Sequence, residues 1–361
     1  MDLGGAENLI MNLYRHIDRS VVQFDFLLHC PTESFYEKEI LSLGGNIFRI
    51  PRYLGYNKVS YERRLTDFLK THPEHIIIHD HLMDSATETL RVAKRLGRIA
   101  VAHSHTASSS FSPSDAYRFF FRRNLWKVAD YRLACSEAAG KWLYRGKTDF
   151  IVLRNGIDTK LFRFSDKCRS DIRREFGLSE STKVIGTVGR MVKEKNQMRL
   201  LSLMRALSEM GSDCSLLMVG EGPLENKLKT TSKKLGLEDR IVFSGPRSDV
   251  NELMSAMDVF VLPSLVEGLG IVLVEAQASG LPCIFTDSIP KEVDLIPNLI
   301  HRTSLSSSDS VWAKAILESE PFIERDKAWE AVADKGYDIS TSSKQLKDFY
   351  VSAMERRCAS V

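Results

Sequence analysis

Residues 258–286 have the sequence DVFVLPSLVEGLGIVLVEAQASGLPCIFT, which predicts a strand, a loop, a helix and a second strand. The first apolar run ends at Pro263, and the helix starts near Gly270. Gly280 is predicted to end the helix, with Pro282 beyond it, because glycine and then proline commonly follow a helix C-terminus. Two strands joined by a helical crossover run parallel. This stretch therefore predicts an α/β fold with a parallel sheet covered by helices.

The same alternation of strands and helices extends along nearly the whole chain. Predicted strands of the first half are QFDFLL, NIFRI, HIIIH, RIAVAH, YRLAC and DFIVL, and those of the second half are VIGTVG, SLLMVG, RIVFSG, DVFVLP, PCIFT and NLIHR. The chain of 361 residues is longer than the usual range of about 100–200 residues for one domain. We therefore predict two doubly wound, Rossmann-like domains, residues 1–160 and 161–338, with a boundary close to the Asn155-Gly156 turn.

The composition is that of an ordinary globular protein, with 43% hydrophobic and 27% charged residues. A net charge of +3 is too small to indicate a nucleic-acid partner, and none is expected. No apolar run is long enough to span a bilayer and no signal peptide is evident, so a cytoplasmic location is predicted. The six cysteines are scattered without a C-x-x-C pair, which favours reduced thiols over a disulfide or zinc framework.

Two cations follow a predicted strand in VIGTVGRMVKEKNQ, residues 184–197. The strand ends at Gly189, Arg190 comes next, and a helix is predicted to open around Lys195. Free N–H groups at a helix start, together with two positive side chains, favour a diphosphate. Taken alone, however, the two charges are better explained as solvated surface side chains.

Two carboxylates in the stretch 258–286 favour a ligand site over solvated surface side chains. Glu267 lies in the loop after a strand and Glu275 on the following helix, at the carboxyl edge where open α/β sheets bind ligands. Carboxylates accept hydrogen bonds from vicinal hydroxyls, and each such charged bond contributes about 1.5–3 kcal/mol. Cations for phosphates and carboxylates for hydroxyls together predict a nucleotide-sugar site. The alternative for Glu275 is that it only stabilises the start of its helix.

Several motifs occur in combination along the chain. They are Glu267-x7-Glu275, the Gly189-Arg190…Lys195 loop, Gly220-Glu221-Gly222-Pro223, Gly4-Gly5-Ala6-Glu7, Asn155-Gly156-Ile157-Asp158 and Pro263-Ser264. Together they resemble the GT-B retaining glycosyltransferases of family 4, and EGLGIVLVEAQASGLPCIFTD is most similar to bacterial enzymes of capsule and exopolysaccharide assembly. The resemblance covers nearly the entire chain. It implies two Rossmann-like domains that face a central cleft, with 339–361 as a C-terminal helix that packs back on the first domain.

The resemblance also implies a reaction and its residues. A sugar is transferred, with retention, from a nucleotide-diphosphate sugar, most commonly a UDP-sugar, to a glycan or polyprenyl-linked acceptor. The implied catalytic residues are Glu267, His105, Arg190 and Lys195, and the implied donor-binding residues are Gly5, Gly189, Arg190, Lys195, Glu221, Gly222, Pro223, Glu267, Gly268, Leu269, Gly270 and Glu275. Arg190 and Lys195 would hold the diphosphate, and Glu275 the ribose. No metal or other cofactor is expected, because Arg, Lys and a helix end supply the positive charge.

Two H-x-H pairs, His79 with His81 and His103 with His105, each end a predicted strand of the first half. Such pairs can bind zinc, but the sequence shows no further ligand at a matching position, so no metal site is predicted. The resemblance places one histidine of the second pair beside the anomeric centre. His105 is the first choice, since Thr106 follows it as in the family, and His103 is the second. His79 and His81 are expected to be structural.

Residues 112–130, SPSDAYRFFFRRNLWKVAD, interleave basic and aromatic side chains. They predict equally well a helix on the inner surface of an anionic membrane and a helix whose aromatic side chains pack on its own sheet.

The chain opens with MDLGGAENLI, which in the resembling family lies just after the first strand of the N-terminal domain. We therefore expect that strand to be missing, through a late start, a shortened chain or an inactive copy. Two other functions remain open: a sugar-nucleotide epimerase of the same architecture, and an inactive subunit that only binds a nucleotide sugar. The sequence leaves the sugar, the base, the acceptor and the oligomeric state undetermined.

Overall fold

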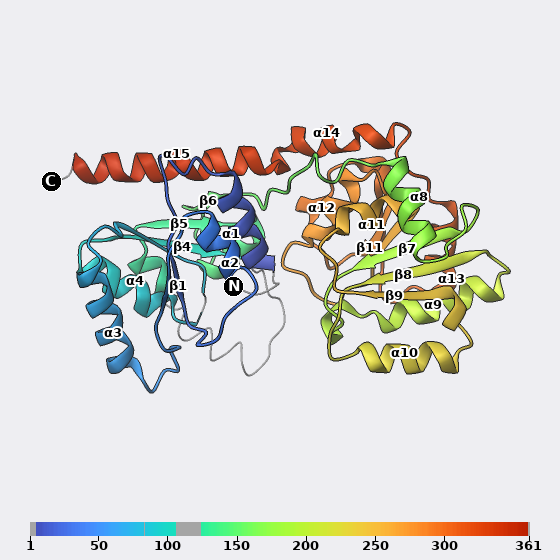
Figure 1. Ribbon diagram of the computed structural model, residues 1–361, viewed down its shortest axis with the longest axis horizontal. Coiled ribbons are helices and arrows are strands. Elements are labelled where there is room, and N and C mark those ends of the chain that lie inside the picture. The colour runs from blue at the N-terminus through green and yellow to red at the C-terminus, as the bar shows by residue number, and fades with distance from the viewer. Residues whose placement is uncertain (1–4, 83, 106–123, 360–361) are drawn as a thin grey trace. The chain divides into compact units, whose positions relative to one another are not determined.

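The computed structural model describes residues 5–82, 84–105 and 124–359. The chain divides into two compact units (Figure 1). The first consists of Met1–Gly156 and Ile339–Val361, and the second of Ile157–Asp338. The division falls between Gly156 and Ile157, within the NG turn segment from which a boundary at 160 was predicted.

The second unit is built on one parallel sheet of six strands. The strands are β7 (Lys183–Val188), β8 (Cys214–Val219), β9 (Ile241–Gly245), β10 (Val259–Leu262), β11 (Cys283–Thr286) and β12 (Ile300–Thr303), in the order β12-β11-β10-β7-β8-β9. Chain order therefore reverses between β7 and β10, which lie side by side. This is the Rossmann arrangement, in which ligands bind at the carboxyl ends of the two strands where the order reverses.

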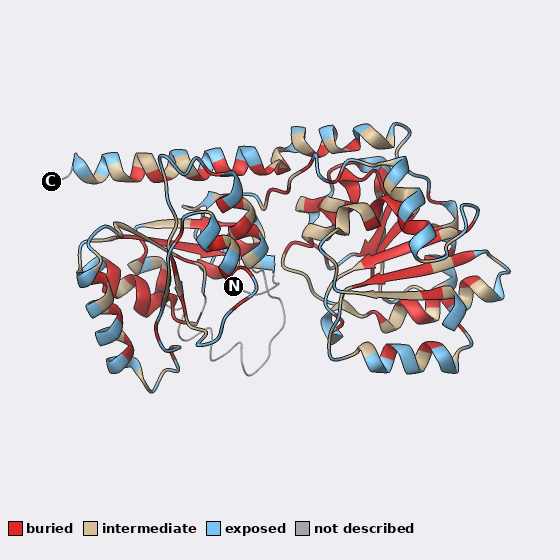
Figure 2. Ribbon diagram, in the orientation of Figure 1, coloured by how far each residue is buried: buried red, intermediate tan, exposed pale blue. Residues whose placement is uncertain are grey.

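Helices cover both faces of this sheet. One core cluster joins the sheet to α8 (Asp166–Glu175), α11 (Val250–Ala256), α12 (Ile271–Ala278) and α14 (Ala328–Val332), and another joins it to α9 (Met198–Glu209), α10 (Glu225–Lys234) and α13 (Asp309–Glu318). All residues of β10 and β11 are buried (Figure 2). Burial on both faces explains why these strands are continuous apolar runs rather than alternating ones.

In its described residues, the first unit contains two parallel sheets. β1 (Phe26–Leu28) pairs with β2 (Ile47–Arg49), and a second sheet has the order β3-β4-β5-β6, with β3 (Ile77–Asp80), β4 (Ile99–Ser104), β5 (Tyr131–Ala134) and β6 (Ile151–Val152). The helices of this unit are α1 (Gly5–His16), α2 (Glu37–Ser42), α3 (Lys58–Thr71), α4 (Ala86–Arg95), α6 (Leu125–Val128), α7 (Glu137–Leu143) and α15 (Ile339–Cys358). Within the described ranges, no strand links β1 to β3, so the single sheet of a doubly wound domain is divided here.

The C-terminal helix α15 belongs to the first unit, although the second unit separates it from the rest in sequence. Leu346, Tyr350 and Ala353 are buried in a cluster that also contains Leu9 and Leu13 of α1 and Val101 of β4. α15 therefore forms part of the core of this unit and is not an appendage to it.

All twelve predicted strands are present within the described residues. The predicted helix at 112–130 lies largely outside them: 112–123 are not described, and Leu125–Val128 forms the short α6. Gly4 of the opening motif is likewise not described. The part of the chain that the structure describes contains no helix that is long and apolar enough to cross a membrane.

Candidate functional site

Lys195 and Glu267, which were predicted from separate motifs, are in direct contact in the second unit. Lys195 Nζ donates a hydrogen bond to Glu267 Oε1 at 2.6 Å, and Ser264 Oγ donates to the same oxygen at 2.6 Å. The Glu267 side chain is 9% exposed and that of Lys195 is 23% exposed. Lys195 follows β7 and Glu267 follows β10, so the pair lies at the strand ends where a Rossmann sheet binds its ligand.

Backbone and amide hydrogen bonds tie the two loops together. Asn196 Nδ2 donates to the carbonyl oxygen of Pro263 at 3.0 Å, and the Leu265 amide donates to the carbonyl oxygen of Glu194 at 2.7 Å. Asn196 has a left-handed φ of 54°, a conformation that Asn tolerates better than most residues. The helix predicted to open around Lys195 therefore begins later: Lys193–Lys195 form one 3₁₀ turn, and α9 starts at Met198.

Two glycines let a third loop, Gly220–Pro223, lie close to the loop that carries Gly189 and Met191. A Cβ atom at Gly220 would clash with the carbonyl oxygen of Gly189, and one at Gly222 would lie 2.5 Å from that of Met191. The Met191 amide also donates to the carbonyl oxygen of Glu221 at 2.8 Å. The predicted segment Glu221–Pro223 thus packs directly on the loop that carries Gly189 and Arg190.

Gly268, Leu269 and Gly270 connect Glu267 to helix α12. Gly270 has φ 81° and directly precedes the helix, while Leu269 is buried. Among the described residues no side chain caps the first turn of α12, and that turn contains no acidic residue. The Leu273 N–H donates to the carbonyl oxygen of Gly270 at 2.9 Å, and the preceding N–H groups of this turn are available to an anionic ligand.

Glu275 lies further along α12, beyond its first turn. Its side chain is only partly exposed, and burial raises the pKa of its carboxyl group to about 7. In the described part of the chain no hydrogen bond or ion pair reaches this carboxylate. Because a macrodipole acts mainly within the first turn, stabilisation of the helix start does not explain Glu275, whereas an open acceptor fits a hydroxyl ligand.

The structure does not bring every predicted residue into contact. Arg190 is exposed, and no partner of its guanidinium is found among the described residues; its carbonyl oxygen accepts a hydrogen bond from Gln197 Nε2 at 2.9 Å. Gly5 begins α1 and is exposed, and His105 follows β4. Since Gly5 and His105 belong to the first unit, their part in donor binding or catalysis stays a prediction.

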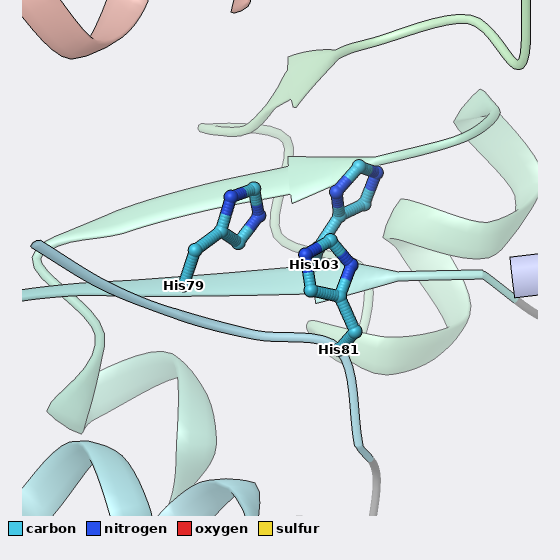
Figure 3. A group of neighbouring side chains, drawn as sticks. All are labelled: His79, His81 and His103. Carbon is cyan, nitrogen blue, oxygen red and sulfur yellow. The ribbon is translucent and has the colours of Figure 1, made fainter. Parts of the chain in front are cut away.

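One grouping was missed from the sequence, which predicted no further ligand for the H-x-H pairs. His79, His81 and His103 each offer a ring nitrogen, and these nitrogens lie within 4.8 Å of one another (Figure 3). The sequence does indicate that the two histidines of each pair share one face of their strand, because residues i and i+2 of a strand point to the same side. To predict that the two pairs meet, one must also know that β3 and β4 are neighbours, which only the fold shows.

Comparisons with known proteins assign the family. The family models "Glycosyltransferase Family 4" and "Glycosyl transferases group 1" match residues 3–161 and 169–318. EpsF of Bacillus subtilis (strain 168), a protein assigned as a glycosyltransferase, is 36% identical over 99% of this chain and 95% of its own length. The chain is a GT-B glycosyltransferase of the family 4 type. The predicted family and the predicted α/β fold of two Rossmann-like domains are thereby confirmed.

Other known proteins are more distantly similar to this glycosyltransferase. The UDP-Gal:α-D-GlcNAc-diphosphoundecaprenol α-1,3-galactosyltransferase of Escherichia coli is 33% identical over 43% of this chain and 42% of its own length. Among solved structures, Anabaena HepE in complex with UDP and glucose has a TM-score of 0.77 at 20% identity, covering 97% of this chain and 96% of that one. HepE shows the fold of this glycosyltransferase, and the E. coli enzyme shows one reaction found among its relatives.

Proposed function

We propose that this glycosyltransferase moves a hexose-type sugar from a UDP-sugar to a glycan or polyprenyl-linked acceptor in polysaccharide synthesis, with retention of the anomeric configuration. The observation that carries this proposal is the contact of Lys195 with Glu267 where the strand order of the second unit reverses. A cation and a carboxylate, held together there, match a diphosphate joined to a sugar.

In this proposal, Lys195 and Arg190 bind the donor diphosphate. Lys195 Nζ is already oriented by Glu267, so it can neutralise charge that develops on the departing phosphate with little reorganisation. Arg190 supplies a second cation, and its exposed guanidinium has five N–H donors for phosphate oxygens. The loop Gly268–Gly270 and the first turn of α12, which follows it, add backbone N–H groups. This positive charge replaces the metal ion that other glycosyl transfers use.

The two glutamates bind the hydroxyl groups of the donor. Glu267 Oε1 accepts hydrogen bonds from Lys195 and Ser264, while no partner of Oε2 is found in the described ranges. Oε2 is therefore the atom that we assign to the transferred sugar. Glu275, with its unpaired carboxylate, is assigned to the ribose hydroxyls, and Glu221–Pro223 line the nucleotide. His105 and Gly5 are proposed to act from the first unit, at the anomeric centre and the β-phosphate.

The names of similar proteins support the choice of donor and acceptor. HepE structures contain UDP and UDP-glucose, and the E. coli relative is named for UDP-Gal and a diphosphoundecaprenol acceptor. A polyprenyl acceptor would bring the enzyme to the cytoplasmic membrane surface, for which 112–130 is the candidate segment.

A donor panel tests the proposal. The full chain is incubated with UDP-, GDP- and ADP-sugars, with and without membrane lipid extract, and nucleotide release is measured together with the anomeric configuration of the product. We expect UDP release that depends on acceptor and survives chelation of divalent ions. Conversion of the donor without acceptor would instead identify an epimerase, and donor binding without turnover would identify a binding subunit.

A further inference from the structure

Four histidines form one cluster on a single face of the β3–β4 sheet. His79 lies in β3 opposite Val101 of β4, and His103 lies two residues further along β4. Because alternate residues of a strand point to the same side, His79, His81, His103 and His105 all share that face. Ring centroids are 4.3 Å apart for His79 and His81, and 5.2 Å for each of these with His103 (Figure 3).

Among the described residues, the cluster has too few hydrogen-bond partners for its ring nitrogens. His79 Nδ1 bonds to Tyr350 Oη at 2.5 Å, and His81 Nδ1 bonds to His105 Nε2 at 2.7 Å. Within the described residues, His79 Nε2, His105 Nδ1 and both nitrogens of His103 are buried without a partner. His103 is only 3% exposed. Each buried polar atom without a partner costs about 1–3 kcal/mol, so four in one place favour a ligand that binds His79 Nε2 and one nitrogen of His103.

The hydrogen bonds that are present suit metal binding. The ordinary arrangement is a histidine that donates one ring N–H to a neighbour and offers the lone pair of its other nitrogen to the metal. Nδ1–H of His79 can donate to Tyr350, and Nδ1–H of His81 can donate to His105. Both bonds leave Nε2 as the nitrogen with the lone pair.

We propose that His79, His81 and His103 bind one divalent transition-metal ion of the zinc class, with Tyr350 and His105 orienting the first two ligands. Three neutral nitrogens suit Zn²⁺, Ni²⁺ or Cu²⁺ and do not suit Mg²⁺ or Ca²⁺, which prefer oxygen. Three protein ligands leave a fourth position for water or an anionic group.

Coordination requires a limited rearrangement. The rings are nearly parallel, with interplanar angles of 11° to 38°, whereas lone pairs that point at one ion lie in ring planes that converge. Turning the rings about their Cβ–Cγ bonds would bring the nitrogens from within 4.8 Å of one another to about 2.0–2.1 Å from the ion. This site lies wholly in the first unit, and it shares His105 with the proposed reaction centre, because His105 contacts His81 here and is also proposed to act at the anomeric centre.

A second group provides an internal comparison. His72, Glu74 and His75 also place three candidate ligand atoms within 4.8 Å. There, however, His72 Nδ1 contacts Glu74 at 2.9 Å and His75 Nε2 contacts Asp25 at 2.8 Å, and the Glu74 side chain is 60% exposed. Carboxylates contact one nitrogen of each ring, and among the described residues one buried nitrogen of this group, His75 Nδ1, lacks a partner, against four in the other cluster. This group serves as a control.

Metal titration of the full chain tests the inference. Protein purified without a histidine tag is stripped with a chelator, titrated with Zn²⁺ or Co²⁺, and followed by metal analysis, the Co²⁺ absorption spectrum and thermal melting. We expect one equivalent of tightly bound metal, an absorption spectrum of tetrahedral Co²⁺ and a raised Tm. Wild-type protein that binds no metal after this treatment would overturn the inference.

Variants locate the ion. His79→Asn, His81→Asn and His103→Asn should each lose the tetrahedral Co²⁺ spectrum, while the control His72→Asn should keep it. Tyr350→Phe, which removes only a hydroxyl group, should weaken metal affinity by about 10–100-fold, as loss of a ligand's hydrogen-bond partner usually does. A Co²⁺ spectrum that survives in all three His→Asn variants would contradict the site, because the ion would then lie elsewhere.

Discussion

The Lys195–Glu267 pair joins residues that are 72 positions apart in the sequence. Glu267 is the more buried partner, with a side chain that is 9% exposed. Removal of one member of a buried pair leaves the other charge without compensation, so substitutions here act on the site as well as on the residue changed.

Replacement of Lys195 tests its proposed role at the diphosphate. Lys195→Ala should lower kcat by about 10²–10³-fold, the effect of removing one preorganised group that stabilises developing charge. Exposed Lys193, two positions earlier, is the matched control, and Lys193→Ala should remain close to wild type. Steady-state kinetics and circular dichroism give turnover and fold separately. Near-normal activity of Lys195→Ala would exclude the diphosphate role.

The raised pKa of Glu275 predicts a pH dependence of donor binding. Ribose hydroxyls donate to the ionised carboxylate, so binding favours the form present above a pKa of about 7. Donor affinity should therefore fall as the pH drops below this value, by about tenfold per pH unit at most, because one proton is involved. Calorimetric titration with UDP on both sides of the pKa measures this. Glu275→Gln should bind UDP more weakly and without the pH dependence; an unchanged profile would remove Glu275 from the site.

The same carboxyl group should make the folded protein less stable as the pH rises, whereas it should make donor binding stronger. Burial raises its pKa from 4.5 in the unfolded chain to about 7, so the folded form binds the proton more tightly. Its contribution to the free energy of unfolding is therefore present below about 4.5 and decreases as the pH rises through 7. Urea unfolding across this pH range measures the free energy of unfolding of wild type and Glu275→Gln. The part of the loss with rising pH that comes from Glu275 should be present only in the wild type. Parallel profiles for the two proteins would contradict the assigned pKa.

Residue types alone singled out Lys195 and Glu267, which the structure brings into contact, but they indicated little of the histidine cluster. Lys195 and Glu267 were found because a cation and a carboxylate each follow a predicted strand. The cluster depends on register: His103 meets His79 and His81 only because β3 and β4 are neighbours. Sequence spacing specifies which face a residue occupies, but not which strand lies beside it.

At the scale of elements, backbone-to-backbone packing positions the loops around the donor site. Gly220 has φ 122° and leaves no room for a Cβ atom beside the carbonyl oxygen of Gly189. The sequence predicted the strands at this site, but it placed the start of α9 at Lys195 rather than at Met198. The reason for the later start is tertiary, since the Asn196 side chain bonds to Pro263 of another loop.

A pair of glycine substitutions separates close packing from backbone strain. Gly236 also has a positive φ, 66°, but nothing lies within 4 Å of the position of its missing Cβ. Gly236→Ala should cost about 1–2 kcal/mol through left-handed backbone strain alone. Gly220→Ala should cost more and should also weaken UDP binding, because the Gly189 loop must move. Denaturant unfolding measures the stability of the two variants, and calorimetry measures their UDP binding. Equal losses in Gly220→Ala and Gly236→Ala would show that the close approach of Gly220 to Gly189 is unimportant.

At the scale of the whole molecule, one unit is continuous in sequence and the other is not. Residues Ile157–Asp338 form the second unit, while α15 completes the first. The alternation of strands and helices predicted two domains, and the Asn155-Gly156 turn gave the approximate boundary. Among the described residues the first unit has two separate sheets, which agrees with the expected absence of the first strand, because that strand is central in a doubly wound sheet.

A core substitution in α15 tests this division. Leu346 is 2% exposed and lies in the core cluster of the first unit, so Leu346→Ala should lower stability by about 2–5 kcal/mol. Exposed Lys344 on the same helix is the control, and Lys344→Ala should change little. Hydrogen exchange should show faster exchange in 5–156 and 339–359, with 157–338 unaffected. Equal loss of protection in both units would contradict their independence.

The central claim is that Lys195, Arg190, Glu267 and Glu275 bind one nucleotide-diphosphate sugar. A crystal structure of the full chain with a UDP-sugar tests it most directly. The account predicts diphosphate oxygens within hydrogen-bonding distance of Lys195 and Arg190, with the transferred sugar on Glu267 and the ribose hydroxyls on Glu275. A nucleotide bound elsewhere, with these four side chains free of it, would contradict the account.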